Sequence, residues 1–385
     1  MNKRKIDNPI LVIIGLLFVV SCSVDPRPLR DVNSNDNEFQ YDWYATADSI
    51  QEATYNQFLG SQGTFATDNA GDNTFQYWPN GHALHILVDG YVRTGDASYV
   101  AKMKALLNGI KSKNGNTYVN VFNDDMLWLA NACVRAYVAT NDSEYKDVAE
   151  FLWTEILKSH SDLFGGGITW KKDTPKSKNA VSNGPAIVLA MRLYDLDGNT
   201  EYLDWAKNLY EWQKSTLVDP VSGLVWDNIS ETDGVVTINK DWIFTYNMGT
   251  WIGSGLRLYQ ETGEEGYLFD VLKSAKSLMT SSKLTTEGLL RDEGEGDGGL
   301  FKGILVRYFT ELILLPDLNT SDRNAFLKFL KFNAETFHAQ GLSKPSMMSG
   351  HNWRVAPTGR VDLKTQLSGV MLIEAAARLE AAELL

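Results

Sequence analysis

The sequence predicts an all-α protein, an (α/α)6 barrel in which six helical hairpins close into a toroid. Three observations predict it: a repeated Tyr–turn–Tyr unit, apolar residues at helical spacing, and about twelve helical segments. The repeats are residues 90–99, 136–145, 193–202 and 258–267, each with Gly or Asn in the turn. Gly or Asn ends one helix in a left-handed conformation, and the acidic or hydroxyl residues that follow cap the next.

Each repeat therefore joins an inner helix to the outer helix that follows it. The longer opposite connections, rich in Gly, Trp and Asp, should rim the open end of the barrel, where loops usually carry function. A small β-hairpin is expected within residues 224–245 of this rim, turning at Asp233-Gly234. The expected helices lie near residues 42–59, 80–94, 97–112, 124–140, 143–160, 180–196, 200–216, 246–262, 265–282, 299–315, 321–340 and 363–383.

Residues 1–21 are predicted to be a lipoprotein signal peptide. A basic segment at residues 3–5 precedes an apolar run at residues 10–20, which is too short to span a bilayer. The run ends in the pattern of a lipobox, so lipid attachment is expected at Cys22. The alternative is an ordinary signal peptide with a chance cysteine.

A flexible, lipid-anchored tether is predicted at residues 22–38, because this stretch is rich in Ser, Asn, Asp and Pro and lacks apolar periodicity. Residues 39–385 follow as a single catalytic domain. We expect a monomer outside the cytoplasm, on the outer membrane or cell surface, that contacts the membrane through its lipid anchor only.

Composition excludes several classes of protein. A formal net charge of −12 disfavours binding to nucleic acid. Once Cys22 is acylated, Cys133 is the remaining cysteine, which excludes a disulfide framework and a cysteine metal site. The five histidines form no metal-binding motif, and no phosphate-binding loop or dinucleotide fingerprint is present. We therefore expect neither a metal nor a cofactor.

Two adjacent carboxylates, Asp124 and Asp125, open a predicted inner helix at the rim. Glycoside hydrolysis uses two carboxyl groups, and a separation of about 5 Å is typical of a retaining mechanism. Repulsion between neighbours raises the pKa of one, while the helix dipole keeps the other ionised. Asn123-Asp124-Asp125 is also an ordinary helix start, so the pattern alone leaves both interpretations open.

Two other segments are unusual. Residues 291–303 alternate acids and glycines, but they lack the spacing of an EF-hand, which favours a solvated acidic loop over a calcium site. Residues 165–172 contain three consecutive glycines followed by Trp170. The glycines permit close backbone approach, and Trp170 is either a platform for a sugar ring or part of the core.

Together these segments resemble glycoside hydrolase family 76, the bacterial endo-α-1,6-mannanases and their fungal cell-wall relatives. The matching stretches run in family order from Trp43 to the C-terminus. They are residues 123–128, 166–170, 178–180 with Asn183, 244–249, 301–308 and 366–376. Leu129 and Gly298 depart from the family pattern, in which Trp and Gln are frequent, and they leave the subsites and fine specificity open.

The resemblance implies an (α/α)6 barrel and retaining, endo-acting hydrolysis of α-1,6-mannosidic bonds in the mannan backbone. It implies Asp124 as the nucleophile and Asp125 as the acid/base, roles that local chemistry alone does not assign. The residues it implies as sugar contacts are Trp78, Asn123, Trp170, Asn183, Tyr246, Asn247, Asp297, Lys302 and Arg354.

Three alternatives share part of this pattern. A mannan transglycosylase would carry every motif and differ only in its products. A non-catalytic glycan-binding surface lipoprotein would need the aromatic residues but not the paired acids. Another (α/α)6 enzyme, such as an unsaturated-uronyl hydrolase or a sugar epimerase, would act on other sugars.

Overall fold

The computed structural model of the protein describes residues 40–385, and residues 42–385 pack as one compact unit. The predicted signal peptide, Cys22 and the tether at residues 22–38 lie outside the described residues. Among residues 40–385, no helix combines the length and the apolar character needed to cross a membrane.

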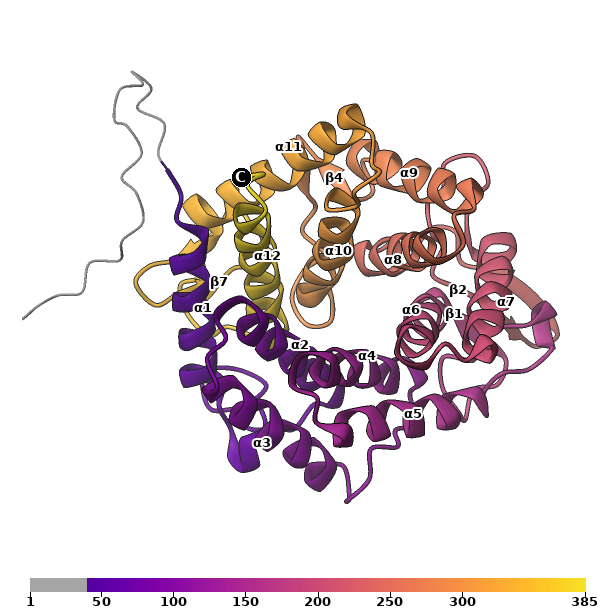
Figure 1. Cartoon of the computed structure of the whole chain (residues 1–385), viewed down its shortest axis with the longest axis horizontal. Coiled ribbons are helices and arrows are strands. Elements are labelled where there is room, and N and C mark those ends of the chain that lie inside the picture. The colour runs from indigo at the N-terminus through magenta and orange to yellow at the C-terminus, as the bar shows by residue number, and fades with distance from the viewer. Residues whose placement is uncertain (1–39) are drawn as a thin grey trace, which may run out of the picture. The chain divides into compact units, whose positions relative to one another are not determined.

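Twelve helices form two concentric rings in the described part of the chain, which confirms the predicted (α/α)6 barrel (Figure 1). The inner helices are α2 (Tyr77–Thr94), α4 (Asn123–Thr140), α6 (Ala180–Asp197), α8 (Thr245–Thr262), α10 (Gly298–Ile313) and α12 (Leu363–Ala381). Each contacts the next, and α12 returns to α2. The outer helices are α1 (Trp43–Phe58), α3 (Ser98–Lys113), α5 (Ser143–Leu157), α7 (Thr200–Leu217), α9 (Glu265–Thr280) and α11 (Thr320–Thr336).

The four predicted tight turns are present and share one geometry. The turn residue is left-handed, with φ between 57° and 71°, at Gly95, Asn141, Gly198 and Gly263. Its N–H donates to the carbonyl of the first tyrosine of the repeat, four residues earlier, in each case. The turn chemistry therefore fixes where each of these inner helices ends.

The long connections carry the strands. β1 (Ser177–Asn179), β2 (Asn228–Thr232) and β3 (Val235–Ile238) form an antiparallel sheet in this order. The predicted hairpin is β2–β3, and Asp233 and Gly234 both have positive φ, as a two-residue hairpin turn requires. β1 was not predicted. Two further hairpins are β4 (Thr285–Thr286) with β5 (Leu289–Leu290), and β6 (Leu342–Ser343) with β7 (Met348–Ser349).

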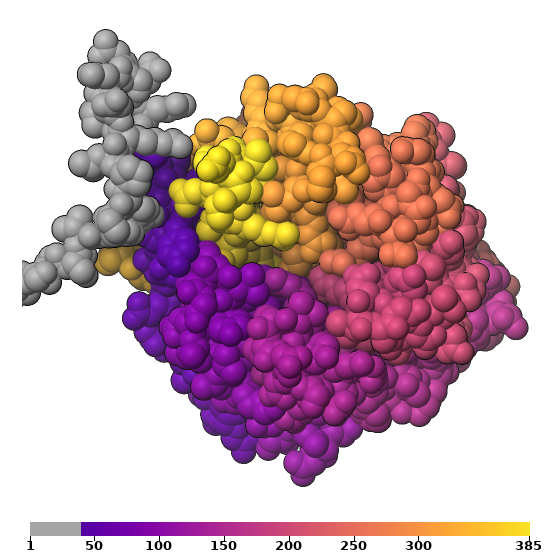
Figure 2. Space-filling view, viewed as in Figure 1, coloured from indigo at the N-terminus to yellow at the C-terminus, as the bar shows by residue number. Residues whose placement is uncertain are grey.

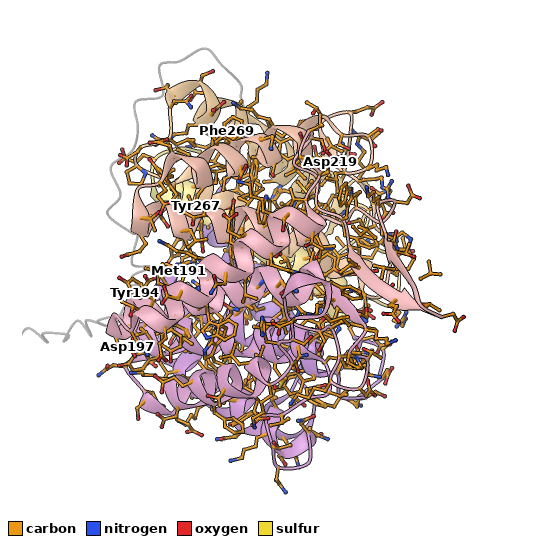
Figure 3. All side chains as sticks on the ribbon, turned by 90° about the vertical axis from the view of Figure 1, so that its right-hand side faces the viewer. Met191, Tyr194, Asp197, Asp219, Tyr267 and Phe269 are labelled. Atoms are coloured by element: carbon orange, nitrogen blue, oxygen red, sulfur yellow. The ribbon has the colours of Figure 1, made fainter. Side chains whose placement is uncertain are left out.

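The barrel thus has two different ends. The side view in Figure 3 shows Tyr194 and Asp197, where α6 finishes, at one end and the projecting hairpin at the other. We call the end with the tight turns the closed end, and the end with the long loops the open end. The space-filling view shows no open channel through the ring (Figure 2).

Glycines allow neighbouring inner helices to approach closely. A Cβ on Gly249 of α8 would lie 2.6 Å from the Cα of Leu305 in α10. A Cβ on Gly303 of α10 would lie 2.7 Å from the Cα of Ser368 in α12. Both obstacles are backbone atoms, which rotation of a side chain does not move away. The diameter of the inner ring therefore depends on these small residues.

We predict that Gly249→Ala lowers the free energy of unfolding by about 1–3 kcal/mol, because the added methyl overpacks the contact between α8 and α10. Urea denaturation monitored by circular dichroism measures this. Gly266→Ala on the outer helix α9 is the matched control, since a Cβ there meets no atom within 4 Å. An equal effect of the two substitutions would contradict the role assigned to the close contact.

Candidate active site

Asp124 and Asp125 are the second and third residues of α4, at the open end of the barrel. Phe122, which precedes the helix, has an extended backbone and offers no side-chain cap. The first N–H groups of α4 are therefore available to the two carboxylates. The backbone N–H groups of Asp124 and Asp125 lower the pKa of the Asp124 carboxyl, which sits at the positive end of the helix dipole, while its Oδ1 has no hydrogen-bond partner among the described residues.

Burial raises the pKa of both carboxyl groups, but their surroundings differ. For Asp124, hydrogen bonds from the first turn and from the Trp170 side chain oppose the effect of burial. For Asp125, the negative charges of Asp124 and Asp297 add to burial and hold its pKa well above the usual range. Asn120 Nδ2 lies 3.2 Å from Asp125 Oδ2. A proton shared by the pair therefore resides on Asp125, and the negative charge on Asp124.

A third carboxylate, Asp227, lies close enough to raise the pKa of Asp124. It is buried and accepts hydrogen bonds from Asn228 Nδ2 at 2.8 Å, Asn247 Nδ2 at 3.0 Å and the Tyr246 hydroxyl at 3.4 Å. Asp227 was not predicted from the sequence to be a site residue. Asn247 was predicted to contact the sugar, but it is fully buried and holds Asp227 instead.

Several half-buried aromatic rings lie at the open end of the barrel. Tyr246 stacks on Phe301 with ring centres 3.9 Å apart, and the charge of Asp124 contributes to the raised pKa of Tyr246. Trp170 packs against Phe122, the residue that precedes α4, at 5.2 Å. Trp78 is also half-buried, on the first turn of α2. Such rings present apolar faces on which a sugar ring can stack, while their polar atoms remain available for hydrogen bonds.

Two asparagines predicted to bind the sugar form hydrogen bonds within the protein. Asn123 is fully buried, and its Nδ2 donates to the Thr169 carbonyl at 2.8 Å. Asn183 is also fully buried, and it bonds both the N–H and the carbonyl of Ile168, at 2.8 and 3.1 Å, and the carbonyl of Asn179 at 2.8 Å. These amides face the protein, and they fix the loop that carries Trp170 to α4 and α6.

Lys302 also faces the protein rather than the substrate. Its Nζ donates to the His351 carbonyl at 2.6 Å and lies 4.4 Å from the centre of the Trp353 ring, and the residue is buried. Arg354 forms an ion pair with Glu287 of the β4–β5 turn at 2.9 Å. The geometry therefore removes Lys302 from the set of direct sugar contacts and assigns the Arg354 guanidinium a partner within the protein.

The acidic loop at residues 291–299 connects inner helices. Glu293 accepts the Thr245 N–H at 2.9 Å and the Thr245 hydroxyl, and so caps α8. Asp297 precedes α10 and pairs with Lys364 of α12 at 3.2 Å, while most of its side chain remains exposed. Within residues 40–385, no group of three or more His, Cys, Asp or Glu side chains is placed to hold a metal ion.

The glycine-rich loop is anchored by Lys178, a buried lysine in the matching stretch 178–180 for which no role was predicted. Lys178 Nζ donates to the carbonyls of Ser161 and Leu163 at 2.6 and 2.7 Å. A Cβ on Gly167 would lie 2.7 Å from the Trp212 ring. The close backbone approach predicted for these glycines is therefore to a core tryptophan.

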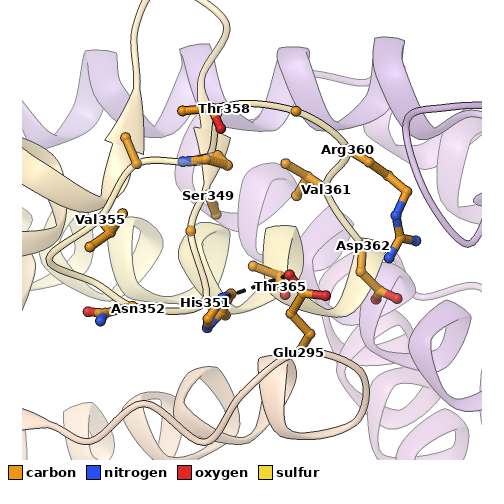
Figure 4. Close-up of a pocket in the computed structure, with 14 residues that line it drawn as sticks. Glu295, Ser349, His351, Asn352, Val355, Thr358, Arg360, Val361, Asp362 and Thr365 are labelled. Carbon is orange, nitrogen blue, oxygen red and sulfur yellow. Dashed lines mark ion pairs between the residues drawn. The ribbon is translucent and has the colours of Figure 1, made fainter.

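A polar pocket of about 390 Å³ adjoins this end of the barrel, between the starts of α10 and α12 (Figure 4). Glu295, His351, Arg360, Asp362 and Thr365 are among its lining residues. His351 and Glu295 face each other across it, with 3.8 Å between Nε2 and Oε1, and form an ion pair when the imidazole is protonated. The open end therefore offers polar side chains beyond the Asp124–Asp125 pair.

An (α/α)6 barrel whose open end presents two coupled carboxyls among aromatic rings is the architecture of a helical glycoside hydrolase. Residues 42–384 match the model of glycosyl hydrolase family 76, and the chain belongs to this family.

Solved structures agree with this assignment. The GH76A α-1,6-mannanase from Salegentibacter sp. HEL1_6 superposes with a TM-score of 0.87 at 58% identity, covering 88% of this chain and 100% of that one. An inactive variant of that mannanase, with two consecutive aspartates replaced by asparagine, is in complex with α-1,6-mannotriose. It superposes with a TM-score of 0.86 at 57% identity, over 88% of this chain and 100% of that chain.

Fungal relatives match over a shorter stretch. The mannan endo-1,6-alpha-mannosidase of Candida glabrata is 28% identical over 252 residues, which is 59% of this chain and 56% of the relative. A putative mannan endo-1,6-alpha-mannosidase of Schizosaccharomyces pombe is 27% identical over 290 residues, 66% of this chain and 64% of the relative. The chain thus spans less than two thirds of either fungal protein.

We predict that Asn183→Ala lowers the free energy of unfolding by about 1–3 kcal/mol, because it leaves buried backbone groups of the Trp170 loop without partners. Chemical denaturation measures the change. Asn73→Ala is the control, because Asn73 is exposed and makes one bond to a neighbouring carbonyl. Unchanged stability combined with weaker mannan binding would show that Asn183 contacts the sugar after all.

Proposed function

We propose that the protein is a retaining, endo-acting glycoside hydrolase that cleaves α-1,6-mannosidic bonds in the backbone of mannan. The observation that carries the proposal is the pair Asp124–Asp125, whose environments differ so that one carboxyl is protonated and the other ionised. The chain contains one Asp-Asp dipeptide, at this position. The Salegentibacter mannanase is inactive when two consecutive aspartates are replaced, which supports assigning the same function to this pair.

In the first step, the ionised Asp124 attacks the anomeric carbon of a mannosyl unit, and Asp125 gives its proton to the departing glycosidic oxygen. The products are a mannosyl–Asp124 ester and a shortened chain with a free hydroxyl. In the second step, Asp125 takes a proton from water, and the water oxygen displaces Asp124 at the anomeric carbon. Two inversions give net retention, and both steps balance without a cofactor.

The surroundings fit this division of roles. First-turn N–H groups and Trp170 stabilise the charge of Asp124, as a nucleophile needs. The neighbouring charges of Asp124 and Asp297 keep the proton on Asp125, as a general acid needs. Once Asp124 is esterified, its charge is gone, so the pKa of Asp125 falls and it becomes the base for the second step. Trp78, Trp170 and Tyr246 are the proposed stacking surfaces for mannose units.

The proposed place of action is outside the cytoplasm, on the outer membrane or cell surface, as a monomer anchored by lipid at Cys22. The basic segment, apolar run and lipobox at residues 3–22 support this. Labelling with radioactive palmitate, and its loss in Cys22→Ser, would test the anchor.

Asp125→Asn should lower kcat/KM on debranched mannan by about 10²- to 10⁴-fold, the usual contribution of a general acid. Asp124→Asn should lower kcat/KM at least as much, because the mannosyl ester cannot form. Release of reducing ends measures the rate, and chromatographic sizing of the products shows whether cleavage is internal. Asp233→Asn in the exposed β2–β3 turn is the control. Wild-type protein that binds mannan but releases no sugar would contradict the enzymatic function.

Asp297→Asn should shift the basic limb of the pH profile of kcat/KM to lower pH. Asp297 raises the pKa of Asp125, so its removal lowers that pKa, and the general acid loses its proton at a lower pH. The acidic limb, which requires ionised Asp124, should move less. Asp233→Asn should move neither limb. A shift of the basic limb to higher pH would contradict the assignment of Asp125 as the acid.

A further inference from the structure

The closed end of the barrel contains a large cavity lined by one arginine from each of the six inner helices. The cavity has a volume of about 920 Å³. Figure 2 shows this face of the molecule, with the C-terminal residues in yellow. The arginines are Arg93, Arg135, Arg192, Arg257, Arg307 and Arg378. The proposed hydrolysis at the open end uses none of them, so this concentration of charge needs a separate explanation.

Carboxylates in the same cavity neutralise only part of this charge. The lining includes four of them, Asp89, Asp195, Glu311 and Glu374, against six guanidinium groups. The ion pairs are Arg135–Asp89 at 2.5 Å, Arg93–Glu374 at 2.9 Å, Arg257–Glu311 at 3.2 Å, Arg257–Asp195 at 3.6 Å and Arg192–Glu311 at 3.8 Å, and Arg93 also pairs at 2.7 Å with Asp48, which lies outside the lining. With Asp48 counted, five carboxylates accompany the six guanidinium groups, which leaves one excess positive charge in a chain whose formal net charge is −12.

Two arginines of the lining are buried, Arg307 of α10 and Arg192, and of these two only Arg192 forms an ion pair. Arg307 is 9% exposed, and its one hydrogen-bond contact is from Nη1 to His82 Nδ1 at 3.4 Å. Burial, together with the charge of Arg307, lowers the pKa of His82 well below its usual value, so the ring is neutral and cannot balance the guanidinium. Arg307 Nε and Nη2 have no hydrogen-bond partner among the described residues. A buried cation without acceptors is costly, which indicates that something supplies them.

Helix dipoles account for some of these arginines but not for Arg307. The C-terminal ends of the inner helices carry partial negative charge at this end, and cations in the last turn complement it. Arg93 and Arg378 occupy such last-turn positions. Arg307 lies more than one turn before the end of α10 at Ile313, where the effect has fallen off. Its charge therefore points to a ligand.

We propose that the closed-end cavity binds a small organic anion through a phosphate, sulfate or carboxylate group that is held by Arg307. Nε and Nη2 form one edge of the guanidinium, and two oxygens of such a group match this edge in a bidentate pair. Nε and Nη2 are buried in the structure, so the proposal requires a rotation of the terminal torsions of Arg307 that turns this edge into the cavity lined by the residue. Val88, Val134, Leu196 and Met371 also line the cavity and accommodate the organic part of the ligand.

Thermal unfolding of the whole protein in millimolar phosphate, sulfate or citrate, against sodium chloride of equal ionic strength, tests the proposal. We expect at least one oxyanion to raise Tm by about 2–4 °C, with saturation. A comparison of phosphate and sulfate with citrate shows whether the site binds phosphate or sulfate groups or binds carboxylates. Sulfate and phosphate also stabilise proteins non-specifically at high concentration, but that effect does not saturate in the millimolar range.

Arg307→Met should abolish the saturable rise and, in chloride alone, leave Tm unchanged or higher, because an uncompensated buried charge has been removed. If this variant does not fold, Arg307→Lys keeps the charge but loses the bidentate edge, and it should weaken the apparent affinity about tenfold. Arg323→Met, an arginine of α11 outside the cavity that also has an unpartnered Nε, should keep the full response. Equal Tm values in all four salts, or an unchanged oxyanion response in the Arg307 variants, would overturn the proposal.

Discussion

Two adjacent carboxyl groups in a half-buried site cannot both be ionised at low energetic cost, and the open end of the barrel is built around this constraint. Asp124 has the N–H groups of the first turn of α4 and the Trp170 side chain to stabilise a negative charge. Asp125 has mainly negative neighbours, which favour its protonated form. The difference between the two environments, rather than either residue alone, makes one group an acid and the other a nucleophile.

That difference depends on loops held in place by buried polar side chains. Asn123, Asn183 and Lys178 bond the backbone of the segment that carries Trp170, and Glu293 caps the helix that carries Tyr246 and Asn247. These contacts run between different hairpins, so they also tie the hairpins together at the open end. Close contacts at glycines such as Gly249 and Gly303 keep the inner helices near enough for the loops to meet.

The sequence was most informative where local chemistry decides structure. The left-handed Gly and Asn residues fixed four helix ends, and Asp233-Gly234 fixed the hairpin turn. Orientation of side chains could not be predicted in the same way. Asn123, Asn183, Asn247 and Lys302 lie in motifs at the open end, but each faces the protein, because long-range packing decides where a side chain points. Asp227 was missed for the same reason, since its own hydrogen bonds, from the Ala180 N–H of α6 and from Asn247 of α8, hold it near Asp124. The signal available in the sequence was that Asp227 is an isolated acidic residue just before the strands of the expected hairpin.

The anomeric configuration of the first product tests the central claim most directly, because it reports whether one carboxyl of the pair attacks the sugar. Proton NMR of α-1,6-mannotetraose during the first minutes of reaction, before mutarotation, distinguishes the two anomers. If Asp124 is the nucleophile and Asp125 the acid/base, the α-anomer forms first. The β-anomer then appears only as mutarotation proceeds. Initial formation of the β-anomer would show that water attacks directly, and it would contradict the roles assigned to this pair.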